Sequence, residues 1–343
     1  MNRDFDLQHR SGFSANRGFG LVELMVAIVV SLLIMAAILQ LYVDITRSNS
    51  ELAKTNALIE NGRFAMQVLQ SDIAHAGFWG ELDNDVPGAL AIPDLCDLTG
   101  WPAAVENLIG IPVQGFADGT TLTGCGVSNV LASSQVLAIM RASTCVFDAA
   151  SCADSGPHIQ ISGCRNDTPE EPYLLSANTA DFTLRKKSCL ATVVERAPRR
   201  KVVSNIYYLA NSNGQPTLMR VSLVNGAYQN PQPLVEGVEA LHFEYGIDNL
   251  GRNGLPISAL NPGDGSADEF VTCAPCTLAQ LSNVVAVKVY LLVRNLEATP
   301  GYVDGKNYQL GDLAIAAAND GFKRHVFSTT VRLVNPSGRR EQP

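Results

Sequence analysis

Apolar residues follow one another almost without interruption from Phe19 to Leu41, and Glu23 is the only charged residue among these 23 positions. At about 1.5 Å of rise per residue they would form a helix of roughly 35 Å, long enough to cross the hydrocarbon core of a bilayer. The segment is too long for the apolar region of a cleaved secretory signal, and no small-residue cleavage site follows it. The pattern predicts a membrane-spanning helix over residues 19–42.

After this segment the apolar residues become periodic. They recur every seven positions, at Ile45, Leu52, Ile59, Met66 and Ile73, with charged and amide residues between them and no proline before Pro87. This spacing predicts that one helix covers residues 19–77 and that its second half lays an apolar stripe on a globular domain. Gly62 costs up to about 1 kcal/mol relative to alanine in mid-helix, so it either serves close packing or a kink, or is merely tolerated.

The remaining chain, residues 78–343, is predicted to be a β-rich globular domain. Its expected strands are Val136–Arg141, Phe182–Arg185, Val202–Ala210, Pro216–Val224, Val238–Ile247, Val284–Arg294 and His325–Asn335. Asn213-Gly214 and Asn225-Gly226 are turn signals, whereas the Gly- and Pro-rich residues from 78 to about 131 predict an irregular excursion. The expected fold class is α+β, a long N-terminal helix packed on a mainly antiparallel sheet.

The start of the apolar segment carries two unusual residues, Gly18 immediately before it and Glu23 inside it. A carboxylate in hydrocarbon is costly and needs a partner. Cleavage after Gly18 would supply one, because Phe19 would then carry a free α-ammonium group one helical turn away from Glu23. The same partner could come from a neighbouring chain in an assembly.

The run Gly18-Phe19-Gly20-Leu21-Val22-Glu23-Leu24 resembles the N-terminus of type IV prepilins and type II secretion pseudopilins. The resemblance implies that residues 1–18 are a leader cut off after Gly18 by a prepilin peptidase. It also implies methylation of the new Phe19 amine and a role for Glu23 in setting helix register during assembly. Gly20 departs from the pattern, because such proteins usually carry Thr or Ser there.

A second resemblance is to the PilW-type minor pilins, and it rests on Glu60-Asn61-Gly62-Arg63-Phe64-Ala65 with Asp72 and on the stretches 234–239, 284–294 and 325–335. It implies a structural subunit that helps prime a type IV pilus, near its tip. Its partners would be other minor pilins, the major pilin, the prepilin peptidase and the inner-membrane assembly platform. The likeness is weak over residues 78–200. Two alternatives stay open, a type II secretion pseudopilin and a tip adhesin or DNA-binding module that uses this region.

All eight cysteines follow the predicted membrane helix: Cys96, Cys125, Cys145, Cys152, Cys164, Cys189, Cys273 and Cys276. An even number on one side of a membrane predicts disulfides in an oxidising compartment, without choosing their connectivity. Arg3, Arg10 and Arg17 precede the span and favour a cytoplasmic N-terminus. The globular domain is therefore expected in the periplasm, anchored in the inner membrane before it reaches the pilus and cell surface.

The charge balance is acidic, with 25 Lys and Arg against 33 Asp and Glu, a formal net charge of −8. An acidic body argues against nucleic acid as a partner. The basic cluster of Arg196, Arg199, Arg200 and Lys201 has no aromatic residues interleaved to stack bases, and a solvated face is the commoner explanation of such a run.

Candidate chemistry is sparse, since the chain carries no nucleophile elbow, zinc-protease motif or phosphate-binding glycine loop. We therefore expect no enzyme and no cofactor. Cys273 and Cys276 have the spacing of a redox pair or half a zinc site, but a local disulfide is the preferred interpretation. Asp248, Asp264 and Asp268 lie in an acidic loop with oxygen donors suited to calcium. The spacing departs from an EF-hand, and a solvated loop is the default.

Overall fold

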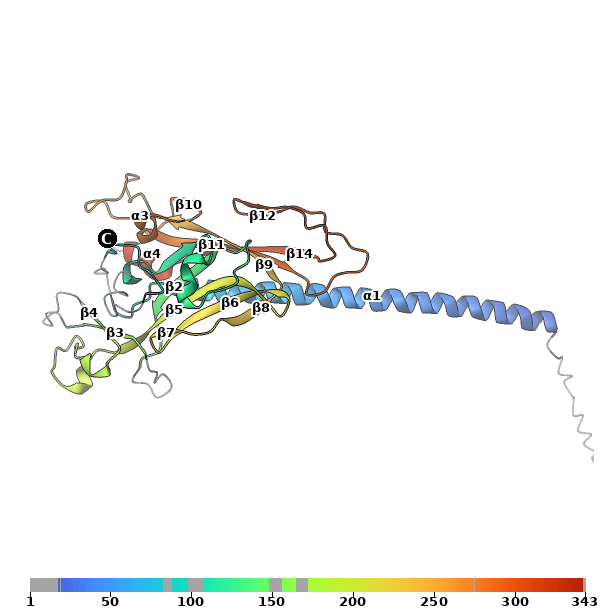
Figure 1. Ribbon diagram of the computed structural model, residues 1–343, viewed down its shortest axis with the longest axis horizontal. Helices are drawn as coiled ribbons and strands as arrows, with labels where there is room; N and C mark the ends of the chain where they lie inside the picture. The colour runs from blue at the N-terminus through green and yellow to red at the C-terminus, as the bar shows by residue number, and fades with distance from the viewer. Residues whose placement is uncertain are drawn as a thin grey trace, which may run out of the picture. The chain divides into compact units, whose positions relative to one another are not determined.

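The computed structural model describes residues 18, 20–82, 88–97, 108–147, 156–164, 172–273 and 275–341. The chain divides into two compact units, Met1–Ala53 and Lys54–Pro343. Helix α1 (Leu21–Ala74) is continuous from the first unit into the second (Figure 1). Because its two parts meet different surroundings, each part is described with its own unit.

The second unit contains two main antiparallel sheets and a small hairpin. The larger sheet has the order β1-β2-β5-β3-β4, and β6 continues it by pairing with β5, β7 and β8. Its strands are β1 (Val113–Phe116), β2 (Val136–Ala142), β3 (His158–Ile161), β4 (Tyr173–Ser176), β5 (Arg199–Ser212), β6 (Gln215–Val224), β7 (Ala227–Tyr228) and β8 (Gln232–Glu236).

The smaller sheet has the order β10-β9-β11-β14, and β12 and β13 form a separate hairpin. These strands are β9 (Val238–Ile247), β10 (Glu269–Val271), β11 (Val284–Arg294), β12 (Tyr308–Leu310), β13 (Leu313–Ile315) and β14 (Arg324–Arg332). Helix α3 (Leu278–Ser282) lies between β10 and β11 in the sequence, and helix α4 (Val334–Glu341) follows β14. The pairing of β9, β11 and β14 is antiparallel throughout.

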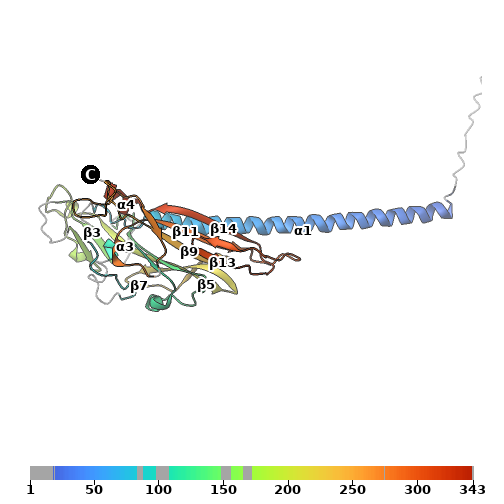
Figure 2. The same cartoon turned by 90° about the horizontal axis from the view of Figure 1, so that it is seen from above.

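The second part of α1 packs into a core shared by both sheets. Leu69 is fully buried in the same cluster as Leu137 of β2, Phe243 of β9 and Val287 of β11. In Figure 2 this part of the helix runs beside β11 and β14. A long helix packed on antiparallel sheets is an α+β architecture, and the predicted fold class is confirmed.

The buried stripe of α1 lies in the second part of the helix, from Leu58 to Ile73. Its buried apolar members are Leu58, Ala65, Met66, Leu69 and Ile73. Ile45 and Leu52 were predicted to share that stripe, but both side chains are exposed. Both residues belong to the first unit, Met1–Ala53, whereas the core that receives the stripe belongs to the second.

Strand β2 is buried on both of its faces. Leu137 and Ile139 face the core under α1, whereas Ala138 and Met140 enter a second core with the buried Trp79. A strand that is covered on both faces has a nearly unbroken apolar sequence. The second core joins one face of the larger sheet to buried residues from the segments between α1 and β2, so the sheet separates the helix from this part of the chain.

Most predicted strands form where the pattern placed them. The runs at 136–141, 202–210 and 216–224 lie in β2, β5 and β6, and those at 238–247 and 284–294 coincide with β9 and β11. Asn213 and Gly214 take positive φ angles of 53° and 81° in the turn between β5 and β6. That conformation is the one expected of an Asn-Gly hairpin turn.

Three local predictions are wrong. Phe182–Arg185 is no strand, and only Arg185 forms an isolated bridge, because the buried Gln160 side chain bonds the backbone of Leu184 and Ala197 in place of a ladder. Residues from 78 to about 131 are not wholly irregular, since β1 pairs with β2. The predicted strand 325–335 ends early, at Arg332, and α4 starts at Val334.

The long connection between β11 and β14 is fixed by one buried arginine. Arg324 is 2% exposed and pairs with Asp304 at 3.0 Å, with Asp320 at 2.7 Å and with Glu239 of β9 at 2.5 Å. Asp304 is itself fully buried. The bonds to Arg324 hold the pKa of Asp320 at about 2, well below its ordinary value.

Candidate assembly site

The first unit presents an apolar helical surface with a carboxylate near its beginning. The large apolar side chains from Leu21 to Val43 are between 47% and 77% exposed. The helix is long and apolar enough to cross a membrane by length and composition. Ser31 donates its hydroxyl to the carbonyl oxygen of Ala27 at 2.7 Å, so this polar group within the span is satisfied inside the helix.

Glu23 lies in the first turn of α1, where a negative charge is favourable at the positive end of the helix dipole. Its Oε2 accepts a hydrogen bond from the backbone N–H of Gly20 at 3.1 Å. The carboxylate therefore turns back toward the start of the helix, the direction from which an α-ammonium would approach. Gly18 lies just before this turn, and Phe19 lies outside the described residues.

Asp72 joins the other end of α1 to the larger sheet. Its side chain is 7% exposed, and Oδ1 lies 2.8 Å from Nε of Arg141 on β2. Oδ2 accepts hydrogen bonds from Asn205 at 2.7 Å and from Tyr207 at 2.9 Å, both on β5. Burial, together with the neighbouring Asp72 charge, raises the pKa of Tyr207, which stays a hydrogen-bond donor. Three donors from two strands thus fix the helix in one position.

Beside this carboxylate the surface is hollowed into an open groove of about 410 Å³. Phe64 and Val68 of α1 line one part of it, and Arg141 and Arg220 of the larger sheet line another. Phe64 is half exposed, with 51% of its surface accessible. The groove therefore combines apolar and basic groups next to the helix.

Gly62 is buried where α1 crosses β14. A Cβ atom built on it would lie 2.2 Å from Cε2 of Phe327, and two further ring carbons would lie within 2.7 Å. Close packing therefore explains this glycine, which the sequence left open between packing, a kink and simple tolerance. The Phe327 ring occupies the space that any larger residue would need.

The disulfides follow the order of the cysteines along the chain. Cys96 bonds Cys125, Cys164 bonds Cys189, and Cys273 bonds Cys276. Cys145 is also disulfide-bonded, whereas Cys152 lies outside the described residues. The prediction of disulfides is confirmed, and Cys273 and Cys276 form the local bond that was preferred over a redox pair or half a zinc site.

The acidic loop does not gather its carboxylates around one point. Asp248 is fully buried and bonds Arg340 at 3.1 Å and the backbone N–H of Gly265 at 2.9 Å. Asp268 accepts the N–H groups of Asn249 and Leu250, and Asp264 accepts that of Ser266. Protein donors thus occupy an oxygen of each carboxylate. Within the described ranges, these three aspartates do not form a ligand cluster.

Two arginines of the basic cluster, Arg199 and Arg200, pack against aromatic rings, whereas Arg196 is exposed. The Arg199 guanidinium lies 4.4 Å from the centre of the Phe147 ring, and Arg200 donates to the carbonyl oxygen of Thr144 at 2.7 Å. Arg200 also lies over Phe78, 5.4 Å from its centre. For these two arginines the expectation of a solvated face is wrong, since aromatic rings distant in sequence cover them.

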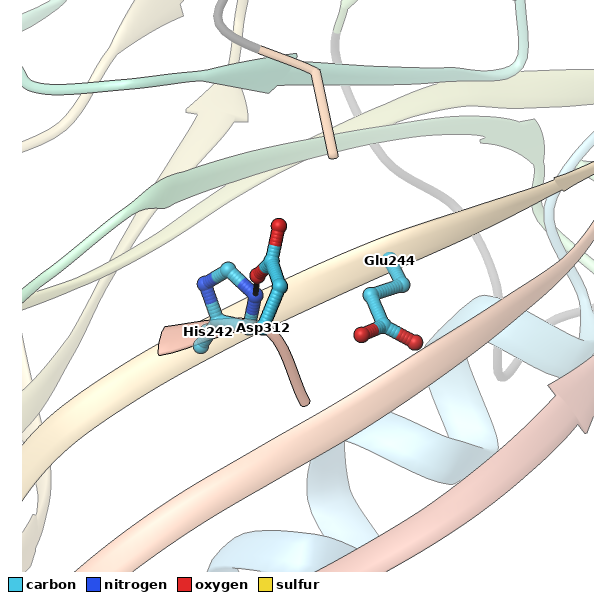
Figure 3. Close-up of side chains that lie close together, drawn as sticks. All are labelled: His242, Glu244 and Asp312. Carbon is cyan, nitrogen blue, oxygen red and sulfur yellow. Dashed lines mark ion pairs between the residues drawn. The ribbon is translucent and has the colours of Figure 1, made fainter. Parts of the chain in front are cut away.

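One cluster of chemical groups was missed in the sequence. His242 and Glu244 of β9 and Asp312 of the turn between β12 and β13 place a nitrogen and two carboxylate oxygens within 4.8 Å of one another. Figure 3 shows Asp312 against the His242 ring, with Glu244 on the same strand. The alternation of side chains along β9 puts His242 and Glu244 on one face, but nothing local in the sequence points to Asp312.

His242 is buried, with 3% of its surface exposed. Its Nε2 lies 2.6 Å from Oδ1 of Asp312, but the contact lacks hydrogen-bond geometry, and this buried nitrogen has no hydrogen bond. Thr272 donates to Oδ2 of Asp312 at 2.7 Å, and this bond, with a smaller contribution from His242, lowers the pKa of Asp312. The aspartate is therefore held as a carboxylate.

Comparison with known proteins gives two family matches at different parts of the chain. Residues 13–39 match the prokaryotic N-terminal methylation motif, and residues 206–335 match the family described as type IV pilus-assembly protein W, PilW. Among solved structures, a type IV-like pilin from Thermus thermophilus aligns with 13% identity over 81% of this chain and 96% of its own, with a TM-score of 0.35. No curated protein matches the chain.

A prepilin-type methylation motif at the start of a long apolar helix, with that helix packed on antiparallel sheets, defines a type IV pilin-like protein. The match over residues 206–335 adds a PilW domain, so the likeness to PilW-type minor pilins is confirmed. The motif and the apolar helix indicate membrane anchoring. The family matched by residues 206–335 is described as a pilus-assembly protein, a structural rather than an enzymatic type.

Proposed function

We propose that this protein is a minor pilin, a subunit that helps to prime assembly of a type IV pilus and lies near the pilus tip. The observation that carries the proposal is the exposed apolar helix with Glu23 in its first turn, joined to a PilW domain. Such a helix needs either lipid or other helices around it. Its partners are other minor pilins and the major pilin, delivered by the inner-membrane assembly platform.

The assembly mechanism follows from the burial of charge. We infer cleavage after Gly18 by a prepilin peptidase and methylation of Phe19, which leaves a cationic α-amino group at the start of the helix. In the dry core of a bundle that ammonium and the Glu23 carboxylate are each costly when alone and compensate one another when paired. Pairing between neighbouring subunits would fix how far each helix is shifted along the next one.

The periplasm is the compartment in which the globular unit is proposed to fold. Three disulfides among the described residues suit an oxidising environment. The arginines of the leader favour a cytoplasmic N-terminus, which places the body on the opposite side of the membrane. The subunit then moves from the inner membrane to the pilus at the cell surface.

Replacement of Glu23 tests the mechanism. We expect Glu23→Ala to leave the protein folded and membrane-bound but to reduce the number of pili per cell. Glu60→Ala is the matched control, because it removes an exposed carboxylate from the second part of the same helix. Pili are counted by electron microscopy in a strain that lacks the native gene, and membrane levels of each variant are measured by immunoblotting. Unchanged piliation with Glu23→Ala would contradict the proposed pairing.

A further inference from the structure

The hairpin of β12 and β13 lies over the outer face of β9, and its turn brings Asp312 to His242 and Glu244. Leu310 of the hairpin is fully buried with Ala240 of β9 and Leu292 of β11, so apolar packing fixes the turn above the strand. Imidazole nitrogen and carboxylate oxygen are both ligands of divalent transition metals. We propose that His242, Glu244 and Asp312 bind a divalent transition metal ion, for which zinc is the natural probe.

The buried imidazole is the strongest reason for a ligand here. A buried polar nitrogen without a hydrogen bond costs free energy, because it has lost its bonds to water without gaining others. Nε2 of His242 is such a nitrogen, and it points into the cluster formed with Asp312. A metal ion accepts the nitrogen lone pair directly and removes this cost.

The two carboxylates are oriented by neighbours that each use one oxygen and leave the other for the cluster. Thr272 holds Oδ2 of Asp312, and Oδ1 faces His242. Tyr290 donates to Oε2 of Glu244 at 3.1 Å. Outer groups of this kind fix the orientation of metal ligands and raise affinity.

The other oxygen of Glu244, Oε1, lies against the hairpin turn. A Cβ atom at Gly311 would lie only 2.2 Å from it, and the φ angle of Gly311 is +60°. Glycine therefore lets the turn approach the carboxylate closely enough to bring Asp312 alongside. A residue with a side chain at this position would push the turn away from β9.

The charge of the site suits a cation, although a lysine lies beside it. Lys288 is 3.5 Å from Oε2 of Glu244, and its ammonium lies over the Phe270 ring, 3.8 Å from the centre. With neutral His242, two carboxylates and one ammonium sum to −1, so a divalent ion meets net negative charge. Lys288 approaches Oε2, the oxygen that also accepts the hydrogen bond of Tyr290.

Zinc takes nitrogen and oxygen ligands at about 2.0–2.2 Å and completes a tetrahedron with water in an open position. The three ligand atoms already lie within 4.8 Å of one another, and Asp312, 61% exposed on its turn, is free to adjust. The ion would then clamp the hairpin to β9. This clamp is independent of the proposed role of Glu23.

Zinc titration of the full chain in detergent micelles tests the proposal. The protein is made without a polyhistidine tag, stripped with EDTA and titrated calorimetrically at pH 7.5. We expect one zinc ion per chain and a higher midpoint of thermal unfolding. Asp312→Asn and Glu244→Gln should each weaken binding by at least about tenfold, whereas Glu297→Gln, which removes an exposed carboxylate, should bind as the native chain does.

Cobalt(II) gives a second readout, because tetrahedral coordination produces visible absorption that the Asp312→Asn variant should lose. Zinc binding that is equally strong in the native chain and in Asp312→Asn would overturn the proposal. Absence of zinc binding to the native chain would overturn it too, and would leave His242 and Asp312 as a simple ion pair. Asp312 is 61% exposed, so we expect Asp312→Asn to fold, and its thermal unfolding without metal checks this.

Discussion

A single added methyl group at Gly62 tests how α1 is seated on the smaller sheet. The glycine is buried, and a Cβ atom there would meet Cε2 of Phe327 at 2.2 Å. This separation is far inside van der Waals contact, so Gly62→Ala must displace the ring, the helix or both. The substitution probes the contact between α1 and β14 without removing any native atom.

Two effects of opposite sign decide how much Gly62→Ala changes the free energy of unfolding. Alanine gains up to about 1 kcal/mol over glycine in a helix interior, and overpacking of a well-packed site costs about 1–3 kcal/mol. We therefore expect Gly62→Ala to lower the free energy of unfolding by up to about 2 kcal/mol. In a Phe327→Ala background the obstruction is gone, and the same substitution should raise that free energy by up to about 1 kcal/mol.

Gly338 provides the matched control. It lies within α4, and a Cβ atom there would meet no atom within 4 Å. Gly338→Ala should therefore stabilise the protein by the helix-propensity difference alone, whether or not Phe327 is present. The comparison separates the helical preference of alanine from the collision with the ring.

Urea unfolding of the full chain in detergent micelles, followed by the fluorescence of the buried Trp79, measures these differences. The diagnostic result is a change of sign between the two Phe327 backgrounds. If Gly62→Ala stabilised both backgrounds as much as Gly338→Ala does, the glycine would be merely tolerated. The described seating of the helix on β14 would then be wrong.

Three further predictions concern buried charge. Asp72→Asn should destabilise the protein by roughly 3 kcal/mol in the same urea assay, because Arg141 loses its counter-ion; a loss below about 1 kcal/mol would contradict the described anchor. Arg324→Met should lower the free energy of unfolding by about 3–5 kcal/mol, because it leaves the buried Asp304 without this counter-ion. Retained native stability would refute this prediction. The pKa of Asp320 is lowered to about 2 in the folded protein, against about 3.9 in the unfolded chain. The carboxylate should therefore contribute fully to the free energy of unfolding above pH 4, and this contribution should disappear toward pH 2. Asp320→Asn should flatten that part of the curve of stability against pH.

Local sequence patterns were sufficient to predict a strand wherever buried residues recur regularly along it. β9 alternates from Leu241 to Ile247 and β11 is almost entirely apolar, and both were found at their observed bounds. The Asn-Gly turn between β5 and β6 was also visible, because its positive φ angles require particular residues. Such features depend on neighbours within a few positions of the chain.

The errors arose where distant residues decide the local structure. Residues 182–185 carry a strand-like pattern, but the Gln160 side chain takes the bonds that a ladder would use. α4 begins where a strand was expected to continue, and its Asn335 donates to the last carbonyl groups beyond α1, those of His75 and Ala76. These partners are separated by 24 to 260 positions and leave no periodic trace.

Only part of the candidate site could be predicted from the sequence. Gly18, Phe19 and Glu23 form a contiguous motif, and their proposed roles came from the sequence. The cluster with Asp312 needs a hairpin that folds back over a strand about 70 positions earlier, so the sequence showed only two of its three members. For Gly62, the sequence allowed packing as one of three explanations, and the Phe327 ring decides among them.

Mass analysis of the mature N-terminus tests the central claim most directly. The protein is recovered from membranes of cells with an active prepilin peptidase and of cells without it, and its intact mass and N-terminal peptide are measured. The account predicts a chain that begins at methylated Phe19 only when the peptidase is active. A chain that keeps Met1 in both strains would contradict processing as a prepilin and would leave a signal-anchored protein in its place.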